Sequence, residues 1–315
     1  MFQFEIPYVY FLAFVGFIFT LLILIHSLGI FVSGLKLFVF SRFFPPNVKK
    51  YGVWAVITGS TDGIGKSYAK ELARRGMNII LVSRNLEKLR ITADEMEKEF
   101  HVCVQVIQAD FTEGWTLYEK IKSELMSKDI GILINNVGLM APQPCHFLSL
   151  SQWNIVDIIH VNITSVLLMT SAILPKMLER KRGAIVNMSS LISLYNIPLF
   201  SCYGACKSAG NSIGLALTYE KLEGIDFQTL ILSCVTTNLL DYSNKIWKWL
   251  SFFAPNADSY AKSAINTLGS SNHTTGYIGH SLQISFKIFP ETVQKYSLYW
   301  ICSYLFKRKE NRTCQ

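Results

Sequence analysis

Two residues that together could protonate a carbonyl oxygen lie four positions apart, Tyr203 and Lys207. Positions i and i+4 share one face of a helix, so both side chains can reach the same ligand. A phenol can give its proton to a carbonyl, and a nearby ammonium favours the phenolate, which lowers the pKa of the phenol. Ser190, thirteen residues upstream, could hold the same oxygen. The sequence therefore predicts a site of carbonyl chemistry around Tyr203.

The same tyrosine–lysine spacing occurs a second time, at Tyr118 and Lys122. Gln105 stands thirteen residues before this tyrosine, at the place where the first pair has Ser190. Because the spacing alone is common, a buried structural tyrosine and a surface lysine are the alternative for either pair. The companion serine favours the first pair.

A glycine-rich segment follows a predicted strand and opens a predicted helix. Glycines allow a tight turn and a close approach to a pyrophosphate, and a helix N-terminus presents free N–H groups to it. This placement predicts a dinucleotide-binding loop. Its candidate cofactor-binding residues are Gly59, Ser60, Thr61, Asp62, Gly63, Ile64 and Gly65.

The end of the second predicted strand indicates which dinucleotide binds. Ser83 stands where an NAD-preferring site usually has an acidic residue, and Arg84 follows it. A guanidinium beside a hydroxyl suits a 2′-phosphate, which predicts NADP(H); the alternative is that Arg84 only covers the surface. We expect Asp110 near the adenine edge and Asn136 under the adenosine.

Short apolar runs alternate with helical segments after Tyr51. Runs of this kind are typical of buried parallel strands, and their repetition predicts an α/β fold with a doubly wound, Rossmann-type parallel sheet. We expect helices over 63–75 and 86–100. We expect strands over 54–58, 78–83, 102–108, 130–135, 184–188 and 227–232.

The N-terminal segment from Val9 to Ile25 contains no charged residue, and its apolar character continues to Val32. About 20 apolar residues cross a bilayer core, so we expect a transmembrane anchor over 1–35 rather than a signal peptide or a buried core helix. A basic linker is expected over 36–50. Its positive charges indicate that the rest of the chain faces the cytoplasm.

Two aromatic stretches follow the predicted strands. One, over 239–260, predicts a substrate lid, with an amphipathic packing helix as the alternative. The other lies in a C-terminal extension over 281–315, which could rest on a membrane surface. The catalytic domain is expected between the linker and this extension, over 51–280.

Composition narrows the classes of partner. The 315 residues carry a net charge of +8, and the seven cysteines are irregularly spaced. We find no zinc-ligand spacing and no nucleic-acid motif, so we expect no metal and no nucleic acid. A membrane or an anionic cofactor accounts for the charge, and free neutral thiols are expected rather than disulfides.

These motifs together resemble the short-chain dehydrogenase/reductase family. Its signature elements stand in order at 58–65, at 135–138, and at Ser190 with Tyr203 and Lys207. The runs 54–59, 83–89, 108–112 and 131–138 most resemble a membrane-anchored group of that family. This group includes 17β-hydroxysteroid dehydrogenases, very-long-chain 3-oxoacyl-CoA reductases and hydroxysteroid dehydrogenase-like proteins, some of which are considered inactive.

The resemblance implies an enzyme and assigns its residues. Tyr203 would be the general acid, Lys207 would lower its pKa and hold the nicotinamide ribose, Ser190 would hold the substrate oxygen, and Asn162 would position a water beside Lys207. The implied reaction is NADPH-dependent reduction of a steroid or long acyl-CoA ketone. It would take place at the endoplasmic reticulum membrane, with a homodimer as a possible assembly.

The resemblance is incomplete at one place. Where the family has a proline beside the nicotinamide, this chain has none between Ser233 and Asn238. Val235 and Thr237 are the expected cofactor contacts there. This departure keeps a second hypothesis open, namely a catalytically weak or inactive relative that binds cofactor or partners at a membrane.

Overall fold

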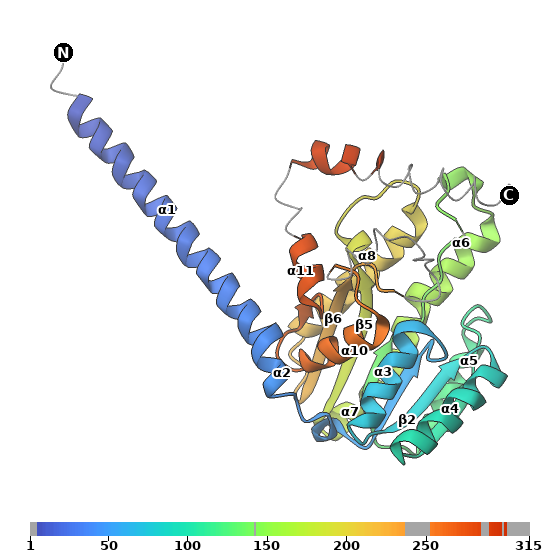
Figure 1. The fold of residues 1–315 in the computed structure, drawn as a ribbon. Coiled ribbons are helices and arrows are strands. Elements are labelled where there is room, and N and C mark those ends of the chain that lie inside the picture. Colours follow the sequence, from blue (N-terminus) through green and yellow to red (C-terminus); the bar gives the residue numbers. More distant parts are fainter. Residues whose placement is uncertain (1–4, 142, 237–252, 285–289, 298, 301–315) are drawn as a thin grey trace. The chain divides into compact units, whose positions relative to one another are not determined.

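The computed structural model describes residues 5–141, 143–236, 253–284, 290–297 and 299–300 (Figure 1). The chain forms two compact units, residues 1–45 and residues 46–315.

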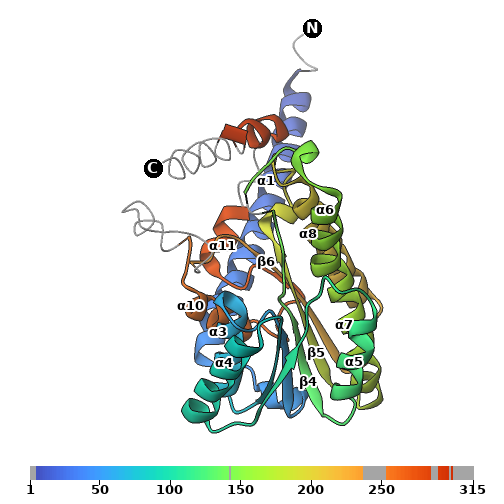
Figure 2. The same cartoon turned by 90° about the vertical axis from the view of Figure 1, so that its right-hand side faces the viewer.

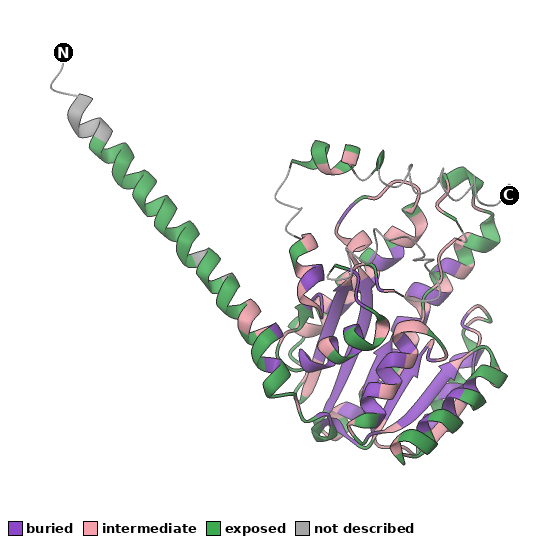
Figure 3. Ribbon diagram, in the orientation of Figure 1, coloured by how far each residue is buried: buried purple, intermediate pink, exposed green. Residues whose placement is uncertain are grey.

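The first unit is helical. It consists of α1 (Glu5–Leu35), a π-helical turn η1 (Lys36–Phe40) and a short α2 (Ser41–Phe43). The described side chains of α1 from Tyr10 to Val32 are exposed (Figure 3), and the apolar window here has a mean hydropathy of 2.5. A helix of 31 residues is long enough to cross a bilayer, so α1 is a candidate membrane span.

The expected basic linker over 36–50 is shorter than predicted. The helix runs on to Phe43, and the unit boundary lies between Pro45 and Pro46. Residues Val48–Tyr51 form a 3₁₀ turn, η2, that belongs to the second unit, with its two end residues buried. The apolar side chains of this turn extend the core. The sequence did not indicate this role, because two lysines lie between them.

The second unit contains a seven-stranded parallel sheet in the order β3-β2-β1-β4-β5-β6-β7. The order reverses between β1 and β4, which confirms the doubly wound, Rossmann-type prediction. The strands are β1 (Trp54–Thr58), β2 (Asn78–Ser83), β3 (Val104–Gln108), β4 (Ile130–Asn135), β5 (Gly183–Ser190), β6 (Ile225–Leu232) and β7 (His273–Thr274).

Helices cover both faces of the sheet. Figure 2 shows α3, α4 and α10 on one face and α5, α7 and α8 on the other. The helices are α3 (Gly63–Arg74), α4 (Leu86–Phe100), α5 (Thr116–Leu125), α6 (Gln152–Ile159), α7 (Ser165–Glu179), α8 (Ser201–Tyr219), α10 (Ala257–Asn266) and α11 (Ile278–Ile284). The remaining turns are η3 (Phe147–Ser149), the π-helical η4 (His160–Thr164) and η5 (Leu191–Ser193).

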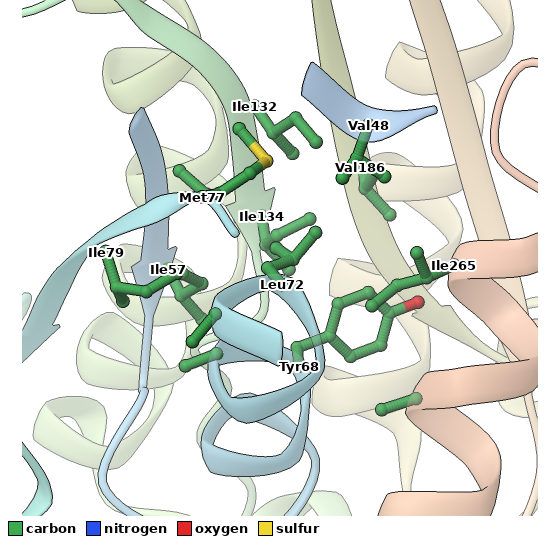
Figure 4. Close-up of a cluster of buried hydrophobic side chains, with 14 of the residues drawn as sticks. Val48, Ile57, Tyr68, Leu72, Met77, Ile79, Ile132, Ile134, Val186 and Ile265 are labelled. Carbon is green, nitrogen blue, oxygen red and sulfur yellow. The ribbon is translucent and has the colours of Figure 1, made fainter. Parts of the chain in front are cut away.

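The sheet separates two apolar clusters. On the α3 face, Ile57 and Ile134 pack with Tyr68 and Leu72 of the helix (Figure 4). On the other face, Val56 belongs to a second cluster with residues of α5 and α7. Neighbouring strand residues thus point to opposite faces and are buried on both, as a parallel sheet requires.

One apolar segment is a core helix, and one expected lid overlaps a helix. The span Gln152–Glu179 is apolar enough to cross a membrane, but 44% of its 18-residue apolar window is buried, and the span contains α7, which packs on β4 as a core helix. The C-terminal bound of the lid expected over 239–260 is wrong. Its last residues belong to the helix α10 (Ala257–Asn266), in which Tyr260 is completely buried. Residues 239–252 of that lid lie outside the described residues.

Candidate active site

The tyrosine and lysine of the predicted pair lie on α8 as expected. Lys207 is 7% exposed, its Nζ lies 5.5 Å from the centroid of the Tyr203 ring, and it donates a hydrogen bond to the carbonyl oxygen of Met188 at 2.9 Å. Burial lowers the pKa of Lys207 to about 8. An ammonium held inside the protein beside a phenol ring can stabilise negative charge at that place.

The expected direction of the Tyr203 pKa is wrong. Burial, with a smaller contribution from Cys206, raises the pKa of Tyr203 to about 12. Removal of the phenol from water is the larger cause, and the Lys207 ammonium beside the ring donates its hydrogen bond to a backbone carbonyl instead. The structure thus presents Tyr203 as a firmly protonated acid.

Two serines close β5 next to this helix. Ser189 Oγ donates to the carbonyl oxygen of Lys207 at 3.0 Å, which ties the strand to α8. Ser190 is the N-cap of η5, and its Oγ accepts the N–H of Ile192 at 3.3 Å. The cap holds Ser190 at the carboxyl end of the sheet, where ligands of doubly wound folds bind.

Asn162 lies in the π-helical turn η4, between α6 and α7. Its Nδ2 donates to the carbonyl oxygens of Leu139 and Ile158 at 2.6 and 2.8 Å, and its Oδ1 accepts the Leu139 N–H at 3.3 Å. A Cβ added to Gly138 would lie 3.2 Å from Asn162 Oδ1 and 3.5 Å from Lys207 Nζ. The asparagine and the lysine therefore meet at the loop that follows β4, where Gly138 leaves room for both.

The glycines of the loop take conformations and positions that a side chain would not allow. Gly59 and Gly63 have φ values of +65° and +52°, and a Cβ on Gly65 would overlap the carbonyl oxygen of Gly59. Asp62 caps α3 by accepting the Gly63 N–H at 2.7 Å. A loop with three glycines at the start of a helix lets a pyrophosphate approach its backbone closely.

The loop is fastened to its neighbours on both sides. Asn136 Nδ2 donates to the carbonyl oxygens of Thr58 and Gly59 at 2.9 and 3.1 Å, which places it at the switch point between β1 and β4. Ser60 is buried, and its Oγ donates to the carbonyl oxygen of Val82 at 3.4 Å. Ile64 is partly buried and packs on the α3-side cluster, so its side chain contributes to the core.

The end of β2 gathers the residues predicted for a 2′-phosphate. The hydroxyls of Thr61 and Ser83 share a hydrogen bond of 3.1 Å, and Arg84 is exposed next to them in the chain. Asp110 follows β3, and its carboxylate accepts the N–H and the hydroxyl of Thr112 at 3.1 and 2.9 Å. The aspartate thus shapes its own turn at the edge where we expected adenine.

A mostly apolar hollow adjoins Tyr203. Leu199 lies in its wall with a φ of +69°, and its carbonyl oxygen accepts the N–H of Cys145, another wall residue, at 3.1 Å. These wall residues were not predicted, because loops that are distant in the sequence supply them. The lining comprises Met140, Ala141, Gln143, Cys145, Leu150, Ile158, Leu199, Phe200, Ser201, Cys202 and Tyr203.

The second tyrosine–lysine pair forms no such site. Tyr118 is buried on α5, and its hydroxyl has no hydrogen-bond partner among the described residues, whereas Lys122 is exposed. The cysteines on α8 are free, and burial raises the pKa of Cys206 to about 11, in agreement with the expected neutral thiols.

The loop after β6 is held by residues that the sequence did not single out. Val235 is 4% exposed, and Thr237 lies outside the described residues. His280 of α11 is completely buried against this loop. His280 lies six positions after the two-residue strand β7, and no sequence pattern there predicts that it supports the loop.

Known proteins match this chain over most of its length. The short chain dehydrogenase family matches residues 53–246. The inactive hydroxysteroid dehydrogenase-like protein 1 of Homo sapiens is 42% identical over 270 residues, 85% of this chain and 81% of that protein. The very-long-chain 3-oxoacyl-CoA reductase of Bos taurus is 40% identical over 237 residues, 74% of this chain and 74% of that protein.

A solved structure is also similar. The short-chain dehydrogenase from Sphingobium yanoikuyae in complex with NADPH has a TM-score of 0.61 and 28% identity, and the match covers 67% of this chain and 82% of that one. The family match spans more than half of the chain, and both relatives align with most of their own length. The chain therefore belongs to the short-chain dehydrogenase family of oxidoreductases.

Proposed function

We propose that this protein reduces a ketone on an apolar substrate to a secondary alcohol, with NADPH as the reductant, at a membrane. The observation that carries the proposal is the buried Lys207 beside Tyr203, with Tyr203 itself in the wall of an apolar hollow. A group that must donate a proton to a carbonyl needs this combination of a protonated phenol and a nearby positive charge.

Residues at the carboxyl ends of β1, β2, β3, β4 and β6, together with Lys207 of α8, would hold the cofactor. The backbone of 59–65 suits the pyrophosphate, and Thr61, Ser83 and Arg84 suit the 2′-phosphate. Asp110 and Asn136 would border the adenosine. Lys207 would bind the nicotinamide ribose, and Val235, with Thr237 beyond the described residues, would border the nicotinamide.

The chain's own part in the reaction is to orient the ketone and to protonate it. When bound, the nicotinamide supplies the hydride. Tyr203 donates its proton to the ketone oxygen, and Ser190 holds that oxygen by a hydrogen bond. With a pKa of about 12, Tyr203 is protonated at neutral pH, which suits reduction. Lys207 then stabilises the phenolate, and Asn162 fixes the loop around the lysine.

The hollow supports an apolar substrate. Seven of its lining residues, Met140, Ala141, Leu150, Ile158, Leu199, Phe200 and Tyr203, are apolar or aromatic. A steroid ketone or the 3-oxo group of a long acyl-CoA has matching chemistry. Both partition into bilayers, which agrees with a chain that carries the candidate span α1.

The test is NADPH oxidation by the full-length protein in membranes, with a panel of steroid ketones and 3-oxoacyl-CoA thioesters. Tyr203→Phe should lower turnover at least about 100-fold while NADPH still binds, because general acid catalysis contributes about 10²–10⁴-fold. Tyr118→Phe is the matched control and should leave turnover unchanged. Equal activity of wild type and Tyr203→Phe would refute the proposal.

Two observations favour a second candidate, a cofactor-binding protein with little or no catalysis. The segment from Ser233 to Asn238 lacks the proline expected beside the nicotinamide, and the similar human protein is named inactive. Tight NADPH binding without turnover of any ketone in the panel would select this candidate.

We also propose that the protein resides in the endoplasmic reticulum membrane as a homodimer, with residues 46–315 facing the cytoplasm. The positive charges that follow α1 support this orientation. Protease digestion of sealed microsomes should remove residues 46–315, and their protection would reverse the orientation. Chemical cross-linking in the same microsomes tests the dimer.

A further inference from the structure

The loop that follows β6 borders the catalytic residues. Ser190 pairs with Leu232 across the parallel strands β5 and β6, so Ser233 begins one residue beyond the level of the catalytic serine. The described part of this loop, Ser233 to Thr236, contains no proline. Contacts from other parts of the chain must therefore hold its backbone.

His280 supplies two of these contacts from inside the protein. Its Nδ1 accepts the N–H of Ser233 at 3.3 Å, and its Nε2 lies 3.2 Å from the carbonyl oxygen of Cys234. Because Nδ1 accepts a backbone N–H, the ring proton belongs on Nε2, which donates to Cys234. One neutral imidazole thus bonds two consecutive residues of the loop.

The surroundings of His280 keep it neutral and in place. The ring is 0% exposed, and the Tyr260 and Tyr277 rings flank it at 5.4 and 5.5 Å between centroids. Burial lowers the pKa of His280 to about 4. A buried polar side chain with both nitrogens bonded to one loop is a rigid support for that loop.

Gln283, one helical turn after His280, makes a third contact to this loop and one contact to Phe253. Its Oε1 accepts the hydroxyl of Ser233, and its Nε2 donates to the carbonyl oxygen of Phe253 at 2.9 Å. The Tyr195 hydroxyl donates to the carbonyl oxygen of Ile284 at 3.3 Å. The helix α11 therefore joins the loop after β6 to the turn that follows Ser190.

We infer that His280 is a positioning residue for the nicotinamide end of the cofactor site. Its two backbone hydrogen bonds fix the conformation of the loop, as a proline would otherwise do. The inference rests on the proposed function, since it assumes that the loop borders the nicotinamide. Its specific consequence is that His280 affects the nicotinamide half of the cofactor and leaves the adenosine half unaffected.

The experiment compares two ligands on the full-length protein in detergent. NADPH contains the nicotinamide, and 2′-phospho-ADP-ribose shares all of the remainder. His280→Gln retains a donor near Nε2, and His280→Asn retains an acceptor near Nδ1. Each variant should weaken NADPH binding about 3- to 10-fold, as expected for the loss of a neutral hydrogen bond, and change 2′-phospho-ADP-ribose binding less than twofold.

Two further variants guard against a merely structural effect. Gln283→Leu removes the hydrogen bond between the partly exposed Gln283 side chain and Ser233. If the histidine variants do not fold, this variant should show the same selective loss of NADPH affinity. Ile121→Ala destabilises the opposite core cluster and should alter neither affinity at a temperature where it is folded.

Equal loss for both ligands, or no loss in a folded variant, would overturn the inference. The readout is binding, so it does not depend on turnover. If no ketone is reduced but the selective loss is seen, the proposed reaction fails and the role of His280 stands.

Discussion

The proton on Tyr203 is held in a partly enclosed place where the neutral phenol is favoured, while the neighbouring Lys207 is favoured in its neutral form by the same burial. These opposite shifts separate the two pKa values to about 12 and about 8. Near pH 7, Tyr203 therefore keeps a proton that it can donate. Lys207 keeps a positive charge that can stabilise the phenolate formed when Tyr203 donates that proton. This state is the one that ketone reduction requires.

The lysine should therefore set the upper pH limit of the reaction. As pH rises through about 8, Lys207 loses its charge and the phenolate loses its partner, so kcat/KM should fall about tenfold per pH unit. A pH–rate profile from 6 to 10 measures this. Lys207→Met should give a low rate without that decline. A wild-type profile that stays flat through pH 8 would contradict the assignment.

Arg84 should decide between the two dinucleotides. A hydrogen bond to a charged group contributes about 1.5–3 kcal/mol, so Arg84→Ala should raise the Kd of NADPH about 10- to 100-fold. The Kd of NADH, which has no 2′-phosphate, should change less than twofold. Arg90→Ala removes another exposed arginine nearby in the chain and is the control. An equal effect on both cofactors would remove Arg84 from the phosphate site.

Local geometry that depends on short-range spacing could be predicted from the sequence. The i, i+4 geometry of Tyr203 and Lys207 and the bare backbone at Gly59 are local properties. His280 could not be predicted, because its partner Ser233 is 47 residues earlier and neither residue belongs to a motif. The direction of the Tyr203 pKa shift was also out of reach, since it depends on burial.

At the scale of elements, the position of α8 on the sheet depends on a glycine. A Cβ on Gly214 would clash with Thr229 Oγ1 of β6, whereas a Cβ on Gly210 of the same helix meets nothing within 4 Å. Gly214→Ala should destabilise the protein by about 1–3 kcal/mol. Gly210→Ala should stabilise it by up to about 1 kcal/mol. Thermal unfolding of both variants measures the difference, and equal melting temperatures would contradict this packing.

The support formed by α11 should make stability depend on acid. The folded pKa of His280, about 4, lies below the unfolded value of about 6.5, so the unfolded chain binds more protons between these values. This contribution is complete above about pH 6.5 and is lost as pH falls through about 4, by at most about 3 kcal/mol. The neighbours that face the ring are Tyr260 and Tyr277, and tyrosines carry no charge in acid.

Denaturant unfolding at pH 4 to 7 measures this dependence. His280→Gln should be less stable at pH 7 and should lose part of the slope between pH 4 and 6.5. If wild type and variant show the same slope, His280 is not the group that titrates.

Elements with a strong apolar pattern were predicted closely. The bounds of β1, β2, β4 and α4 agree with the sequence, because continuous apolar runs or a full amphipathic repeat define them. The strand β7 was not predicted, because its two residues are too few to form an apolar pattern. They are a strand because they pair with β6. The first four residues of α10, 257–260, were assigned to a lid, because the small and polar residues of this helix conceal a buried face.

At the scale of the whole molecule, the chain consists of a candidate span and a second compact unit, with a boundary at Pro45 and Pro46. Residues 46–315 contain the sheet and the candidate site residues, so removal of residues 1–45 should release the protein from carbonate-washed membranes. Fractionation followed by immunoblotting measures this. If the truncated chain stays in the pellet, membrane binding also resides in residues 46–315.

Leu199 carries a further consequence. A left-handed conformation costs an L-residue about 1–2 kcal/mol, and a branched side chain gains nothing from it locally. Leu199→Gly should therefore raise the melting temperature by a few degrees while it removes part of the wall beside Tyr203. Leucine at this position therefore combines a locally unfavourable backbone with a place in the wall beside Tyr203. Turnover of the ketone panel by Leu199→Gly, measured beside its melting temperature, shows whether that wall contributes to the proposed reaction.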